Sequence, residues 1–182
     1  KSDSSDILFN AAKGKTLAIA SDAVVESDSD SALIFSGGGT YDIAGEVRAG
    51  GFELRGSTLT QTGRLTAGDF RISSRNSADS DTLYFVKSGA ELLTDSVTMN
   101  GTAADYVFKV DGYLKNRTTI EVGAQYSERD SGNIPPTAFC ISGGGTVDTD
   151  GLNIGSRVDV AGTLNVGNID FTASRNRAVL KV

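Results

Sequence analysis

The phrase SALIFSGGGTYD (Ser31 to Asp42) recurs near the other end of the chain as TAFCISGGGTVD (Thr137 to Asp148). Each copy contains an apolar run, three glycines, a threonine and an aspartate. Within a chain of 182 residues, such a recurrence predicts a fold built by repetition. Neither glycine triplet is followed by the lysine or the helix of a phosphate-binding loop, so the triplets predict tight corners where backbones approach closely.

The similarity extends beyond these phrases. GSTLTQTGRLTAGDFRISSRN (residues 56–76) matches GSRVDVAGTLNVGNIDFTASRN (residues 155–176) with one inserted residue. SDSSDILFNAAKGKTLAIASDAV at the start corresponds to SADSDTLYFVKSGAELLTDSV in the middle. We therefore predict a single all-β domain over residues 1–182, with an internal repeat of approximately residues 6–76 and 81–176.

The apolar runs are short and rich in Val, Ile, Leu, Phe and Thr, and Gly, Asn, Asp and Ser separate them. In RVDVAGTLNVG the apolar residues fall on a period close to two, which is typical of strands with one buried face. Their recurrence predicts an all-β, β-solenoid or parallel β-helix-like fold. A β-sandwich or jelly roll is the alternative, because the spacing is irregular and Pro135-Pro136 interrupts it.

Composition restricts the partners and the compartment. A net charge of −6 without histidine disfavours nucleic acid, which needs clustered cations, and no apolar run approaches the ~18 residues of a membrane span. The sequence opens at Lys1 without Met, which suggests a mature, processed form. The sequons at Asn100 and Asn116 agree with a glycoprotein that is secreted to the extracellular space or the cell surface.

Acidic phrases suggest one candidate ligand. Aspartates at Asp-x-Asp spacing can surround a calcium ion, although solvated turns explain the same pattern. The candidate calcium ligands are Asp28, Asp30, Asp79, Asp81, Asp148 and Asp150. We expect no other cofactor.

The two ends of the sequence resemble the inner junction of its repeats. The closing FTASRNRAVLKV joined to the opening KSDSSDILFN reads much like FRISSRNSADSDTLYF inside the chain. Neither end carries a polar cap, so strands of a second copy can pair there and form a homopolymer. Cys140 lies between two apolar residues on a strand that we expect to be covered on both sides. The predicted subunit contacts are Cys140, Ile7, Leu8, Phe9, Val179, Leu180 and Val182.

The duplicated β phrases and the missing caps resemble those of extracellular self-assembling β-proteins. These include surface-layer and adhesin solenoids and the sheath proteins of filamentous methanogenic archaea. The resemblance implies a structural cell-envelope protein, not an enzyme, that assembles by strand augmentation into a filament, tube or sheath. A glycan-binding adhesin or phage-fibre module is the alternative. A carbohydrate-active β-helix enzyme using Asp148, Asp150 and Arg157 is a weaker one.

Overall fold

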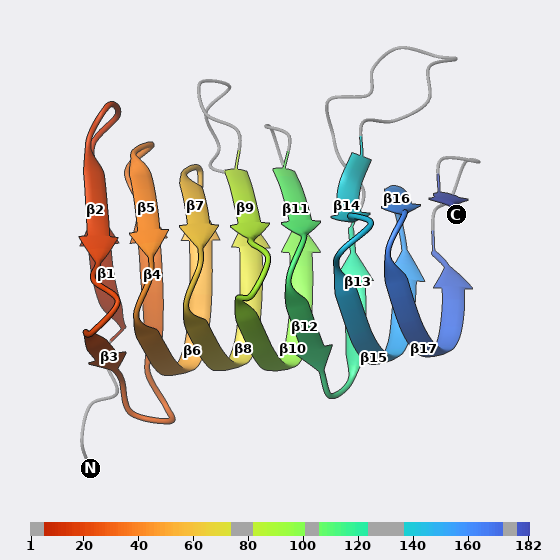
Figure 1. Cartoon of the computed structure of the whole chain (residues 1–182), viewed down its shortest axis with the longest axis horizontal. Coiled ribbons are helices and arrows are strands. Elements are labelled where there is room, and N and C mark those ends of the chain that lie inside the picture. The colour runs from red at the N-terminus through yellow and green to blue at the C-terminus, as the bar shows by residue number, and fades with distance from the viewer. Residues whose placement is uncertain (1–5, 74–81, 101–105, 124–136, 173–177) are drawn as a thin grey trace.

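In a computed structural model, which describes residues 6–73, 82–100, 106–123, 137–172 and 178–182, the chain forms two parallel β-sheets (Figure 1). The 10-stranded sheet contains β1 (Ile7–Asn10), β3 (Val24–Glu26), β4 (Ala32–Ser36), β6 (Glu46–Arg55), β8 (Arg64–Ser73), β10 (Glu91–Asn100), β12 (Tyr113–Asn116), β13 (Thr119–Val122), β15 (Thr146–Ile154) and β17 (Thr163–Phe171). The 8-stranded sheet contains β2 (Thr16–Ile19), β5 (Thr40–Ile43), β7 (Thr58–Gln61), β9 (Thr82–Val86), β11 (Tyr106–Val110), β14 (Thr137–Ile141), β16 (Arg157–Val160) and β18 (Val179–Lys181).

The chain alternates between the sheets, so that each circuit adds one level to both of them. From β6 it passes to β7, then to β8 directly above β6, and then to β9 above β7. The long strands bend at a corner halfway along, and their two halves pair separately with β3 and β4 at one end of the stack. Figure 1 shows these levels following one another from the N-terminal to the C-terminal side.

The prediction of an all-β fold is confirmed, since the described residues form strands and turns without a helix. Every pairing between the named strands is parallel, which is consistent with the predicted solenoid arrangement. Parallel pairing argues against the jelly-roll alternative, whose strands are antiparallel.

The core consists of columns of side chains that run through all levels. The register places inward residues directly above one another, so that one column contains Ile7, Leu33, Phe52, Phe70, Val97, Ile120, Leu152 and Ile169. A second column contains Phe9, Phe35, Leu54, Ile72, Met99, Val122, Ile154 and Phe171. In the middle levels these side chains are buried almost completely, and each added level extends the same apolar core.

Aromatic rings strengthen the first half of this core. Phe9 stacks on Phe35 with ring centroids 4.7 Å apart, and Phe35 stacks on Phe52 at 4.9 Å. The series continues through Phe70, whose ring lies 5.3 Å from that of Phe52. Offset stacks of this kind add to the free energy gained by burying the rings.

Glycines occupy the corners where levels approach most closely. A Cβ atom on Gly39 would contact the Ala11 side chain at 2.7 Å, and one on Gly145 would overlap the carbonyl oxygen of Val110. The predicted close backbone approach at both triplets is therefore confirmed. The first triplet joins β4 to β5, and the second joins β14 to β15, so the similar phrases cross between the two sheets in opposite directions.

Candidate functional site

The C-terminal end of the stack leaves an apolar surface open. Phe171 of β17 points along the core column but is 59% exposed, because no described strand lies beyond it. Ile169 and Leu164 on the same strand, and Leu180 on β18, are partly exposed for the same reason. The outer edges of β17 and β18 also lack a strand partner among the described residues, so their backbone groups are free to pair.

The N-terminal end of the stack is open in the same way. Ile7 of β1 belongs to a core column and is 42% exposed, and Phe9 beside it is half-buried. Leu17 on β2 and Val25 on β3 are also inward residues that remain partly exposed. Within the described ranges, β1, β2 and β3 each pair on one side only.

Of the residues predicted at the ends, Ile7, Phe9 and Leu180 lie in core columns at these two surfaces. Leu8 and Val179 are on the opposite, outer faces of their strands, in register with Ile34 and Arg157. Leu8 of β1 is 59% exposed and Val182 is 93% exposed, and Val179 lies on the outermost strand, β18. Phe171 and Ile169 of β17 were not predicted. The apolar alternation of β17 was visible in the sequence. Its position at the end of the stack was not, because it depends on how many circuits of the chain precede it.

Cys140 lies on the outer face of β14, away from the core. Its neighbours Phe139 and Ile141 are fully buried, so the thiol points outward, and it is half-buried between Lys109 and Asp159 of the adjacent strands. The half-buried thiol does not by itself show that a second layer covers this face of the strand. A contact between subunits at this position remains a prediction.

The candidate calcium ligands do not come together among the described residues. Asp28 and Asp30 lie in the exposed segment between β3 and β4, far from Asp148 on β15, while Asp79 and Asp81 lie outside the described residues. The described part of the chain contains no group of three or more side chains that could hold a metal ion.

Asp148 is instead part of a hydrogen-bonded ladder on the outer face. It accepts hydrogen bonds from the Tyr113 hydroxyl at 2.6 Å and from the Asn165 amide at 2.7 Å. The bonds from Tyr113 and Asn165, with the charge of Lys115 nearby, hold the pKa of Asp148 below its ordinary value. The bond to Asp148, together with burial, raises the pKa of Tyr113. Arg157 is on the other sheet and is paired with Asp159 at 2.8 Å, so the structure does not join it to Asp148.

The two sequons differ in accessibility. Asn100 is exposed at the end of β10. Asn116 is only 3% exposed, its amide nitrogen donates to the Thr149 hydroxyl at 3.1 Å, and its carbonyl accepts from the Thr94 hydroxyl at 3.1 Å. This packing argues against a glycan on Asn116, because an attached glycan would break a buried hydrogen-bond ladder.

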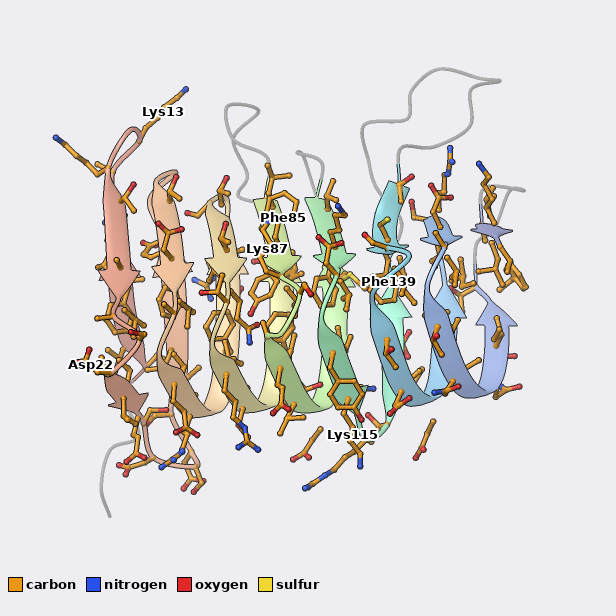
Figure 2. All side chains as sticks on the ribbon, viewed as in Figure 1. Lys13, Asp22, Phe85, Lys87, Lys115 and Phe139 are labelled. Carbon is orange, nitrogen blue, oxygen red and sulfur yellow. The ribbon has the colours of Figure 1, made fainter. Side chains whose placement is uncertain are left out.

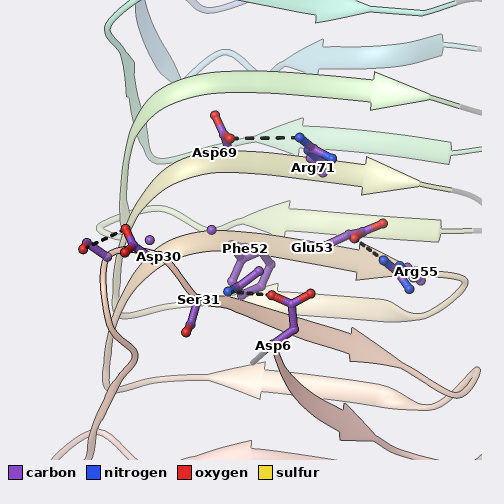
Figure 3. A pocket seen from close by; sticks show the side chains of 12 residues that line it. Asp6, Asp30, Ser31, Phe52, Glu53, Arg55, Asp69 and Arg71 are labelled. Carbon is purple, nitrogen blue, oxygen red and sulfur yellow. Dashed lines mark hydrogen bonds and ion pairs between the residues drawn. The ribbon is translucent and has the colours of Figure 1, made fainter. Parts of the chain in front are cut away.

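An open hollow of about 330 Å³ lies near the N-terminal levels (Figure 3). Its charged groups are already engaged, since Glu53 pairs with Arg55 at 2.6 Å and the Asp6 carboxylate accepts a hydrogen bond from the backbone amide of Ala32 at 3.1 Å. Although burial opposes it, hydrogen bonds from Arg55 and Ser73 lower the pKa of Glu53. A carboxylate with a lowered pKa, such as that of Glu53, is not suited to act as a general acid near neutral pH.

No protein-family model matches the chain, and no curated protein or solved structure shows significant similarity to it. Within the described ranges there is also no helix with the length and apolar character to cross a membrane.

Proposed function

We propose that this chain is a β-solenoid structural protein of the cell exterior that assembles head to tail by pairing the strands of its two open ends. The proposal rests chiefly on the exposure of core-column side chains at both ends of the stack. Burying apolar side chains contributes about 1.5–3 kcal/mol for each large residue. Pairing the free strand edges adds backbone hydrogen bonds in the same contact.

The two ends are complementary in register. If the pattern of the stack continues across the junction, Ile169 lies against Ile7 of the next copy, and Phe171 lies against Phe9. In the 8-stranded sheet, one core column begins at Leu17 on β2 and ends at Leu180 on β18. The same continuation therefore places Leu180 against Leu17 of the next copy. Along these columns the junction then resembles an internal step of the stack, with apolar residues on both sides. The first half of β17 has no such counterpart among the described residues, because β3 lies one level further into the stack than β1.

The junction joins two different surfaces, so each added copy presents a new open end. Such a heterologous contact produces an open filament unless the rotation between copies closes a ring. A filament, tube or sheath is thus the expected product. We place it outside the cell because Asn100, the acceptor residue of a sequon, is exposed.

The test compares two substitutions of phenylalanine by aspartate. Phe171→Asp places a charge in the proposed junction, whereas Phe85→Asp makes the same change on the outer face of β9, where Phe85 contacts Lys87 (Figure 2). Electron microscopy should show ordered polymers for the unmodified chain and for Phe85→Asp. Phe171→Asp should remain a monomer with an unchanged β circular dichroism spectrum. Polymers formed by Phe171→Asp, or an unmodified chain that stays monomeric, would refute the proposal.

A further inference from the structure

The outer face of the 8-stranded sheet carries an apolar patch near its centre. Leu83 and Phe85 of β9, Val107 of β11 and Cys140 of β14 point away from the core, because each alternates with buried residues of its strand, and all four are half-buried. Lys87 follows on the same face, and its Nζ lies 5.3 Å from the centroid of the Phe85 ring (Figure 2). We call the four apolar residues the side patch.

The outer face of the 10-stranded sheet has charged columns instead. Its register places Glu46 beside Arg64, and Glu53 beside Arg71. Covering such a face takes charged groups out of water, which costs free energy. Covering the side patch removes apolar surface from water, which is favourable. A lateral contact is therefore expected on the 8-stranded sheet.

The charges on either side of the side patch complement one another. Asp42 of β5 and Lys181 of β18 stand in the same outward column as Phe85, three strands before and three strands after β11. Both are exposed, and neither forms an ion pair with a described residue, since the nearby Asp159 is already paired with Arg157 at 2.8 Å. If two such faces meet about a two-fold axis along β11, Asp42 of each copy lies against Lys181 of the other.

The centre of this arrangement joins apolar groups and leaves no charge without a partner. The strands β9 and β14 flank β11, so the two-fold axis places Phe85 against Cys140 of the other copy, and Val107 against its own counterpart. Lys109 of β11 lies beside the axis, but it is paired with Asp111 at 3.4 Å. The antiparallel arrangement of two faces is therefore complementary in both polarity and charge.

From this complementarity we propose that the side patch joins two polymers of this chain side by side, in antiparallel orientation. The contact rests on the proposed head-to-tail assembly, because four half-buried side chains expose too little apolar area to hold single copies together, whereas stable interfaces bury roughly 800 Å² on each partner. In a polymer the side patch recurs after every eight strands of the sheet, about 38 Å at ordinary strand spacing. A second polymer of the same chain has the same repeat, so all of its patches meet their partners at once and many weak contacts act together.

Charge exchange tests the antiparallel orientation. Asp42→Lys sets a lysine against Lys181 of the other polymer, so at low salt the polymers should separate and their width should halve. Asp42→Lys/Lys181→Asp exchanges the two charges and should restore the paired width. Paired polymers of Asp42→Lys, or single polymers of the exchanged variant, would overturn this orientation.

A matched pair of variants locates the contact by electron microscopy of the assembled full chain. Phe85→Asp places a charge in the side patch, and Leu93→Asp places the same charge at a half-buried position on the outer face of β10. The unmodified chain and Leu93→Asp should form paired polymers, whereas Phe85→Asp should form single polymers of half the width. Equal widths for all three would refute the side-by-side contact and leave head-to-tail assembly intact. An unmodified chain that forms no polymer would refute both proposals.

Discussion

The hydroxyl of Tyr84 donates a 2.7 Å hydrogen bond to the side-chain carbonyl of Gln61, and both side chains are fully inaccessible to solvent. Gln61 is a polar member of an otherwise apolar core column, between Ile43 and Val86. Its amide nitrogen donates to the backbone carbonyls of Gly63 and Glu91. The glutamine is therefore tolerated in the core because each of its polar atoms has a partner.

Removing the tyrosine hydroxyl should destabilise the fold. Tyr84→Phe leaves the Gln61 carbonyl buried without a donor, which costs about 1–3 kcal/mol of unfolding free energy. Chemical denaturation monitored by circular dichroism measures this loss. The double variant Tyr84→Phe/Gln61→Leu should recover part of it, and a double variant that is as unstable as the sum of the two single changes would contradict the coupling.

The same hydroxyl should make the protein sensitive to alkaline pH. Burial raises the pKa of Tyr84 well above its ordinary value of about 10. Because the unfolded chain releases this proton first, the associated stability is complete below about pH 10 and is lost as the pH rises toward the raised pKa. Unfolding free energies measured from pH 8 to 11 should therefore fall more steeply for the unmodified chain than for Tyr84→Phe. Parallel curves would exclude Tyr84 as the cause.

The corner glycines should differ sharply in their tolerance of alanine. A Cβ atom on Gly63 would overlap the carbonyl oxygens of Ala44 and Gly45 one level below, whereas one on Gly144 would find its nearest neighbour at 3.8 Å. Gly63→Ala should cost about 1–3 kcal/mol, as overpacking does, and Gly144→Ala about 0.5 kcal/mol or less. Thermal denaturation of both variants provides the comparison. Equal melting temperatures would mean that the levels can move apart at no cost.

The strands and their buried faces could be predicted from the sequence, but the proximity of distant residues could not. The alternation around Leu164 and Val166 indicates a strand with one inward face, and the structure contains it in β17. A glycine triplet fits any tight corner. The sequence therefore could not show which pair of strands is joined by the triplet after Ser36 and which by the triplet after Ser142. Tyr113 and Asp148 are hydrogen-bonded only because one circuit of the chain places β15 beside β12.

The polarity of the proposed polymer gives the sharpest test. Ile7→Asp should block only the N-terminal surface, and Phe171→Asp only the C-terminal surface. Each variant alone should therefore remain a monomer of 18.9 kDa. An equal mixture should form a dimer of twice that mass and grow no further, since it contains one intact pair of complementary ends. Light scattering coupled to size-exclusion chromatography measures these masses. Dimers of either variant alone would instead reveal contacts between like ends, and polymers in the mixture would show that the contacts lie elsewhere on the molecule.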